Sequence, residues 1–223
     1  MNANNGRKRV MWVEKYRPKT LDEMVGQNKI RRYFSNIINN GQNLNHYIFV
    51  GKSGVGKTTL ARILADTLNA DFLEFNASDD RSITFIRNKI IPAMRSVSLR
   101  GRYKIIFLDE TENLMADAMN CLKSPMEKYS HNAKLIFACN DMSNINSAIR
   151  SRCIIFQFAP ISNEEMKSRL LYIAEKEGVD VDDDILNYIC EKSHGDMRIA
   201  INLLEKIHLQ GFEKNDFGLI LEI

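Results

Sequence analysis

Short apolar runs alternate along the chain with longer segments in which apolar residues recur three or four positions apart. The runs are rich in Ile, Phe and Val and predict five strands, at 47–50, 72–75, 105–108, 135–138 and 154–158. Helical spacing between them predicts helices near 57–69, 82–96 and 113–129. Because the strands are almost wholly apolar and alternate with helices, the pattern indicates an α/β fold with a parallel five-stranded sheet covered on both faces.

The pattern changes after Pro160, where strands cease and helices are predicted near 163–177, 183–193 and 196–209. Ser162 and Glu165 form a capping box, in which each side chain satisfies a free backbone N–H at the start of a helix. The 223 residues therefore predict a core at 1–159 followed by a small helical domain at 160–223, with the boundary near Ala159.

Charge follows the same division. Residues 1–159 carry 24 Lys and Arg against 14 Asp and Glu, a net charge of +10, whereas residues 160–223 carry 7 against 14, a net charge of −7. Seven of the basic residues fall between Arg81 and Lys104, a stretch without any acid. Such a strip attracts polyanions, although a solvated helix face is the alternative explanation.

Composition narrows the class of protein. With 44% hydrophobic and 26% charged residues, 11 Gly and 4 Pro, the chain is unlike collagens, disordered chains and disulfide scaffolds. It has no run of about 18 uncharged apolar residues and no signal-peptide core, so we expect an intracellular protein without a membrane partner. Composition does not decide between the nucleus of a eukaryote and the cytoplasm of a prokaryote or virus. Its four cysteines lack metal-ligand spacing, and we expect reduced thiols.

One segment has the pattern of a phosphate-binding loop. Residues 51–58 read Gly-x4-Gly-Lys-Thr and lie directly between a predicted strand and a predicted helix. Glycines let backbone N–H groups close around phosphate oxygens, and the helix N-terminus adds partial positive charge. We expect Lys57 to reach the β- and γ-phosphates of ATP and the Thr58 hydroxyl to bind Mg²⁺.

Polar residues follow two further strands. Asp109 and Glu110 end one of them, at the edge where a nucleotide-binding sheet holds phosphates. We expect Asp109 to support the Mg²⁺ shell and Glu110 to polarise the attacking water, with a helix cap as the alternative. Asn140 ends another strand, where its amide would hold the water or the γ-phosphate unless it only forms a turn. Arg152 precedes the last strand. We expect it to act as an arginine finger toward a neighbouring subunit, with a solvated side chain as the alternative.

Several blocks together resemble the AAA+ ATPases, and more narrowly the small subunits of sliding-clamp loaders, the replication factor C family. The blocks are Trp12–Pro18 with Leu21–Gln27, the phosphate loop, Asn76–Arg81, Asp109–Glu110, Met126–Ser130, Ser151–Cys153 and Gly195–Asn202. The resemblance covers residues 11 to about 209. It implies an AAA+ core with a helical lid, and an ATPase subunit of a hetero-oligomer, a pentamer in this family, that loads a sliding clamp at primer-template DNA.

The resemblance also implies residue roles. Asn140 would be the sensor on the core, Arg198 the second sensor reaching from the lid, and Arg152 the finger that acts on a neighbour's ATP. A solvated lid residue is the alternative for Arg198. Nucleotide contacts are implied for Val13, Tyr16, Arg17, Val25, Gly51, Lys52, Ser53, Gly54, Val55, Gly56, Lys57, Thr58, Thr59, Asn140 and Arg198. The best candidates for DNA phosphate contacts are Arg81, Arg87, Lys89 and Lys123.

Departures from the family pattern leave alternatives open. Lys52-Ser53 replaces two prolines, Thr111-Glu112 replaces Ala-Asp, and Pro125 should kink its predicted helix or start a new one. We expect the family's collar-building third domain to be absent, as in a fragment or a different assembly. One alternative is therefore a subunit that binds ATP and supports assembly with little hydrolysis. The other is a P-loop kinase or another AAA+ remodeller.

Overall fold

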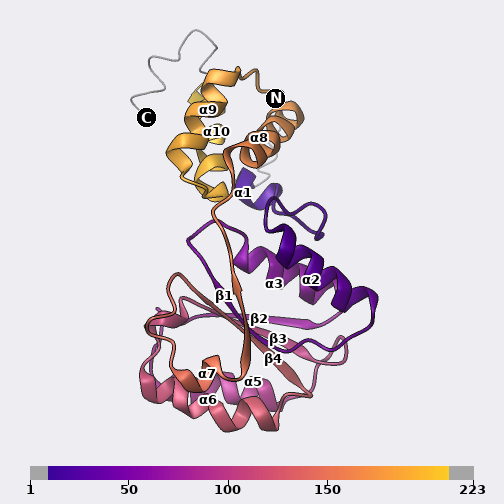
Figure 1. Cartoon of the computed structure of the whole chain (residues 1–223), viewed down its shortest axis with the longest axis vertical. Helices are drawn as coiled ribbons and strands as arrows, with labels where there is room; N and C mark the ends of the chain where they lie inside the picture. Colours follow the sequence, from indigo (N-terminus) through magenta and orange to yellow (C-terminus); the bar gives the residue numbers. More distant parts are fainter. Residues whose placement is uncertain (1–9, 211–223) are drawn as a thin grey trace, which may run out of the picture. The chain divides into compact units, whose positions relative to one another are not determined.

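A computed structural model describes residues 10–210 of the chain (Figure 1). Residues 1–9, on which the expectation about a signal peptide depends, and 211–223 lie outside the described part. The chain divides into two compact units, one spanning Pro18–Ile161 and the other combining the segment up to Arg17 with the residues from Ser162 onward.

The larger unit contains a five-stranded sheet in the order β2-β3-β4-β1-β5, in which all neighbouring strands are parallel. All five predicted strands are confirmed, with ends that differ by one or two residues from the prediction. Their bounds are β1 His46–Val50, β2 Asp71–Asn76, β3 Lys104–Asp109, β4 Ala133–Cys139 and β5 Cys153–Gln157.

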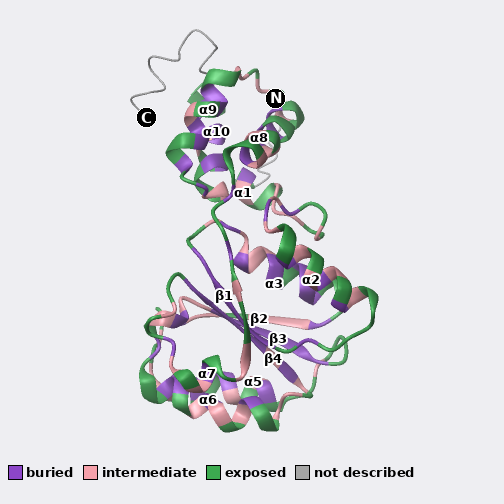
Figure 2. Cartoon of the chain, in the orientation of Figure 1, coloured by how far each residue is buried: buried purple, intermediate pink, exposed green. Residues whose placement is uncertain are grey.

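Helices cover both faces of this sheet (Figure 1). One face carries α2 (Asn28–Asn39) and α3 (Lys57–Thr67). The other carries a continuous helical segment, α4 (Ile83–Phe85), η1 (Ile86–Ile90) and α5 (Ile91–Arg95), together with α6 (Ala116–Lys128) and α7 (Ser147–Arg150). The central strands are accordingly buried along almost their whole length (Figure 2), as expected for strands that are apolar on both sides.

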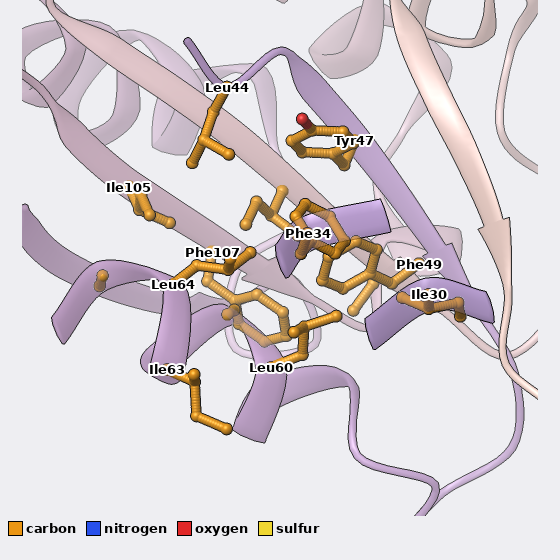
Figure 3. Close-up of a cluster of buried hydrophobic side chains, with 14 of the residues drawn as sticks. Ile30, Phe34, Leu44, Tyr47, Phe49, Leu60, Ile63, Leu64, Ile105 and Phe107 are labelled. Carbon is orange, nitrogen blue, oxygen red and sulfur yellow. The ribbon is translucent and has the colours of Figure 1, made fainter. Parts of the chain in front are cut away.

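Successive strand residues supply the two cores in turn, because side chains alternate across a strand. Phe49 and Phe107 point toward α2 and α3, whereas Ile48 and Leu108 belong to the opposite cluster. Figure 3 shows the first cluster, in which the Phe34 ring of α2 lies 5.1 Å from Tyr47 and 6.1 Å from Phe49. Aromatic pairs at these centroid distances stabilise a core beyond their buried area.

α2 was not predicted from the sequence. Its pattern is nevertheless present, because Ile30, Phe34 and Ile37 recur at helical spacing and all three are buried. The start of the helix is difficult to recognise, because Gln27 at the N-cap has a left-handed backbone and no side-chain capping bond. The helix therefore begins without the polar signature by which helix starts are recognised in sequence.

Pro125 does not start a new helix, which was one of the two predicted outcomes. α6 is one helix from Ala116 to Lys128 and runs through Pro125. The proline removes one backbone donor near the C-terminal end of the helix, while Leu122 and Met126 on either side of it are buried in the second core. Apolar burial thus holds the last turn in place despite the lost hydrogen bond.

The smaller unit is helical, as predicted. Its described residues form α8 (Asn163–Glu177), α9 (Asp183–Ser193) and α10 (Met197–Gln210), with the short α1 (Trp12–Lys15). The capping box of Ser162 and Glu165 is present at the start of α8. Each of the three longer helices contributes buried apolar residues, among them Leu170 of α8, Ile189 of α9 and Leu204 of α10. Within residues 10–210 no helix combines the length and apolar character needed to cross a bilayer.

The amino-terminal segment belongs to this helical unit, whereas the sequence placed it with the core. Trp12 is buried there, its backbone N–H donates to the Glu205 carboxylate at 2.9 Å, and its ring lies 5.1 Å from the ring of His208. Lys15 and the Tyr16 hydroxyl both donate to the Glu177 carboxylate, at 2.5 and 2.6 Å. The described division between the units falls after Ile161 rather than after Ala159.

His46 joins three elements of the core. It begins β1 with 8% of its surface exposed, its Nδ1 accepts the Leu135 N–H of β4 at 2.9 Å, and its Nε2 lies 3.1 Å from the Met126 carbonyl of α6. Only the neutral ring with its proton on Nε2 makes both bonds, since Nδ1 must accept. Burial lowers the pKa of His46 from 6.5 to about 4.

We predict that His46 makes the chain less stable in mild acid. The unfolded chain takes up a proton at this residue near pH 6.5 but the folded chain only near pH 4, so the contribution is complete above pH 6.5 and is lost as the pH falls toward 4, by up to about 3 kcal/mol. In urea denaturation at several pH values, the free energy of unfolding should therefore fall more steeply with acid in the wild-type chain than in His46→Gln, whose side chain does not titrate. Parallel pH profiles of the two proteins would contradict the prediction.

Candidate functional site

The phosphate loop is held at the carboxyl end of β1. Gly51 follows β1 directly, and a Cβ atom at this position would lie 2.7 Å from the carbonyl oxygen of Phe158 and 2.8 Å from its Cβ atom. Gly56, the N-cap of α3, has φ +103°, which residues with side chains rarely adopt. Two of the glycines are thus required by the local geometry.

Lys57 is the first residue of α3 and is largely buried beneath the loop. Its ammonium group donates to the carbonyl oxygens of Gly51 and of Lys52, the latter at 2.8 Å. Thr58 and Thr59 follow half-buried in the first helical turn, while Lys52 and Ser53 are exposed. A lysine, a helix N-terminus and a glycine loop therefore surround one position, an arrangement suited to an anion.

The neighbouring strands bring carboxylates to the same edge of the sheet. Asp109 ends β3 opposite Asn76 of β2, and burial raises the pKa of Asp109, while its hydrogen bond from the Glu110 N–H and the Lys57 charge act in the opposite direction. Glu110 follows with φ +50°, so the chain turns sharply at this residue. Its carboxylate accepts a hydrogen bond from the Ser78 hydroxyl.

Ser78 and Asn113 complete the surroundings of Glu110. The Asn113 amide donates to the Ser78 oxygen at 2.8 Å and lies 3.4 Å from the Glu110 carboxylate. Neither residue was among the predicted site residues. A signal was available for Ser78 only, because it lies in the Asn76–Arg81 block and follows a strand that ends at the same edge as β3.

Asn140 follows β4, the strand between β3 and β1. Its backbone N–H and its side-chain Nδ2 both donate to Oε1 of Glu112, at 3.0 and 2.9 Å. Glu112 lies in the 3₁₀ turn Thr111–Asn113 that follows Glu110. One of the two residues that depart from the family pattern after Asp109-Glu110, Glu112, is therefore the one that holds Asn140.

Arg152 lies at the amino end of β5 and is bound to its own chain. Its guanidinium donates to the Glu127 carboxylate of α6 at 2.9 and 2.5 Å and to the Ala148 carbonyl at 3.0 Å. Glu127, whose side chain is 66% exposed, was not among the predicted site residues. It lies in the Met126–Ser130 block but has no spacing that would link it to Arg152.

The sheet separates Arg152 from the phosphate loop of the same chain. β5 and β1 are parallel, with Cys153 opposite His46 and Gln157 opposite Val50, so Arg152 precedes the first pair and Gly51 follows the last. At about 3.3 Å per residue, the two positions are roughly 20 Å apart along the strands. An arginine side chain cannot span that distance, so Arg152 does not reach its own loop from this position.

Four predicted nucleotide contacts lie in the helical unit. Tyr16 donates its hydroxyl to Glu177, Arg17 pairs with Glu14, and Val13 is half-buried in α1. Arg198 is exposed near the start of α10, where the Asp196 carboxylate accepts its backbone N–H at 2.8 Å. Val25 is half-buried in the core unit, whose loop also holds the buried Val55 and half-buried Gly54.

The predicted DNA contacts lie on the face of the sheet opposite α3. Arg87 and Lys89 are exposed on η1, Arg81 is exposed just before α4, and Lys123 is half-buried on α6. Lys104, which belongs to the basic strip, differs from these residues because it is buried and its ammonium donates to the Ser96 hydroxyl. The exposed part of the strip is therefore smaller than the sequence indicates.

The donors at the sheet edge suit one small divalent cation. Mg²⁺ prefers oxygen ligands and is usually held by one or two protein groups together with phosphates and water. The Thr58 hydroxyl and the Asp109 carboxylate are donors of this kind. Among residues 10–210 no three His, Cys, Asp or Glu side chains lie together as a metal cluster, so a cation here would depend on phosphate ligands as well.

Comparison with known protein families gives two matches. Residues 47–161 match the model of the ATPase family associated with various cellular activities, AAA, and this match covers more than half of the chain. Residues 168–209 match the RCF1/5-like AAA+ ATPase lid domain. The two matched segments fall in the two compact units of the structure.

Curated relatives agree with these matches. The chain is 44% identical over 201 residues to a protein of Archaeoglobus fulgidus named replication factor C small subunit, covering 87% of this chain and 63% of that protein. A protein of the same name from Staphylothermus marinus is 43% identical over 202 residues, covering 88% and 61%. The chain thus spans less than two thirds of the length of these relatives.

A solved structure shows the same fold. The RuvB Holliday junction branch migration motor of Thermotoga maritima superimposes with a TM-score of 0.77 and is 25% identical. The match covers 93% of this chain and 71% of that one. The likeness therefore includes both the sheet unit and the helical unit.

Proposed function

The chain belongs to the AAA family of ATPases, and on this basis we propose that it binds and hydrolyses ATP as a subunit of a sliding-clamp loader that acts on primer-template DNA. One observation carries the proposal. The loop around Lys57, the Asp109-Glu110 pair and Asn140 converge on one edge of the sheet in a chain that is 44% identical to a replication factor C small subunit. Its place of action would be the compartment that holds the replicating DNA.

In this proposal the protein groups have distinct tasks. Lys57 and the N-terminus of α3 bind the phosphates, and Glu110 accepts a proton from the attacking water. Thr58 and Asp109 hold Mg²⁺, which when bound neutralises phosphate charge. Asn140 orients the water or the γ-phosphate. Val13, Tyr16, Arg17 and Val25 contact the adenine and ribose side, and Arg198 senses the γ-phosphate.

Arg152 would serve the ATP of a neighbouring subunit. The support is its place at the opposite edge of the sheet from the phosphate loop of its own chain. A finger that acts in trans makes hydrolysis depend on assembly, which fits a hetero-oligomer of five subunits. Glu127 pairs with the guanidinium at that edge. A neighbour's phosphates would have to displace this carboxylate.

The proposed DNA face is the helical layer of α4, η1 and α6. It carries exposed cations whose contacts with phosphates would position a duplex without reading bases. The sliding clamp and the other loader subunits are the remaining partners in this proposal.

The first test of the function concerns Glu110. We expect Glu110→Gln to keep ATP binding and to lower turnover by the reconstituted complex by roughly 10²-fold, because a positioned base is lost. Lys57→Ala should lose ATP binding itself, and Glu175→Gln, an exposed carboxylate on α8, should change neither. ATP binding and steady-state hydrolysis are measured with and without primed DNA and clamp. Unchanged turnover in Glu110→Gln would favour an assembly subunit with little hydrolysis of its own.

The second test concerns Arg152. Arg152→Ala should leave the ATP affinity of its own subunit nearly unchanged but slow hydrolysis at the adjacent site, since the finger belongs to the neighbour. Mixed complexes of Arg152→Ala and Lys57→Ala chains should be active only where an intact Lys57 faces an intact Arg152. Arg150→Ala, an exposed arginine two residues away, is the matched control. Equal impairment of the isolated chain and of the complex would indicate a role in cis.

The third test concerns DNA. Arg87→Ala should weaken binding to all duplex sequences alike and make the log–log salt dependence of affinity shallower by about one, because each phosphate contact contributes about −0.9. Arg62→Ala removes a cation from α3, on the other face of the sheet, and should leave the slope unchanged. Fluorescence anisotropy over a salt series measures both. An unaltered slope after joint substitution of Arg81, Arg87 and Lys89 would identify a solvated helix face.

A further inference from the structure

We propose that Glu112 is a positioning residue for hydrolysis, which fixes the Asn140 amide in a single orientation toward the nucleotide. This inference rests on the proposed function, because it assigns Asn140 a partner within the same site. It differs from the expectation drawn from the sequence, where Thr111-Glu112 counted as a departure that could weaken hydrolysis.

The hydrogen bonds determine which way the amide faces. A carboxylate has only acceptors, so the group of Asn140 that lies 2.9 Å from Oε1 of Glu112 must be its NH₂ and not its carbonyl. The backbone N–H of Asn140 donates to the same oxygen at 3.0 Å, so the residue is held at two points. Bonds to an ionised acceptor are roughly twice as strong as neutral ones. The amide oxygen of Asn140 and its second N–H are therefore left to act on other groups.

The turn that carries Glu112 is itself anchored. Thr111 is fully buried and its hydroxyl donates to the Leu108 carbonyl of β3 at 2.8 Å. The amide of Asn144, in the loop after Asn140, lies 3.4 Å from the Glu112 carbonyl. Because β3 and β4 are adjacent and parallel, a short turn after β3 suffices to reach the residue that follows β4. Glu112 thus links the turn after β3, the strand that ends in Asp109, with Asn140 after β4.

The other oxygen of the same carboxylate is unusual. Glu112 Oε2 is buried and has no hydrogen-bond partner in the described part of the chain. An unpaired buried acceptor costs about 1–3 kcal/mol. A residue that served stability alone would gain from a neutral side chain here, so we ascribe the carboxylate to the two bonds that its other oxygen accepts from Asn140.

Turnover tests the proposal through a double-mutant cycle in the reconstituted complex. Glu112→Gln keeps the shape of the side chain but removes the charge, and it should lower kcat by roughly 10-fold with little change in the KM for ATP, as for partners that orient a functional group. In an Asn140→Ala background the same substitution should lower kcat by less than about 2-fold, because its target is gone. Glu112→Asp introduces the acidic residue typical of the family and should keep most of the kcat that Glu112→Gln loses. Glu175→Gln serves as the control.

Two kinetic outcomes would overturn the proposal. One is an equal loss of kcat in the wild-type and Asn140→Ala backgrounds, which would mean that Glu112 acts independently of Asn140. The other is a rise in KM with unchanged kcat, which would assign Glu112 to ATP binding.

A second measurement is independent of hydrolysis. In the ¹⁵N-labelled chain, the side-chain NH₂ resonances of Asn140, identified by their loss in Asn140→Ala, should shift in Glu112→Gln and stay in place in Glu175→Gln. Unmoved resonances would overturn the contact on which the proposal depends. If the wild-type complex failed to hydrolyse ATP while the resonances shifted as expected, the proposed function would be wrong and the hold of Glu112 on Asn140 would stand.

Discussion

Parallel pairing of β3, β4 and β1 is the constraint on which the candidate site depends. Parallel strands end at the same edge, so residues that are far apart in sequence, such as Lys57, Asp109 and Asn140, follow neighbouring strands there. The register is fixed because each strand is buried on both faces, between α2 and α3 on one side and α5 and α6 on the other. A shift by one residue would exchange the two cores, since alternate side chains enter each.

The same constraint explains how much of the fold the sequence predicts. Apolar runs and helical spacing are local signals, and they identify all five strands and the larger helices except α2, whose start lacks a capping side chain. The assignment of the amino-terminal segment is a different problem. The sequence indicates that Trp12 is buried but not where, because its partners Glu205 and His208 lie almost 200 residues away along the chain. Hydrophobic pattern alone does not say which core such a residue joins.

The site shows the same division between local and distant information. Motifs identify the residues that would contact ATP, because glycine spacing and strand-end carboxylates are visible in the sequence. The residues that hold them are not visible, since Glu112 meets Asn140 and Glu127 meets Arg152 only through tertiary structure. Glu112, a departure from the family pattern, and Glu127, which had no predicted role, are thus linked to predicted site residues only by the fold.

The missing side chain at Gly51 has a mechanical consequence. The Phe158 N–H donates to the Val50 carbonyl, and its carbonyl and Cβ lie where a side chain at position 51 would be. Phe158 is also only three residues before the end of the sheet unit, so the peptide that leaves the sheet touches the phosphate loop on its way out. A displacement of that loop would therefore push directly on the peptide at Phe158, because no free space separates the two.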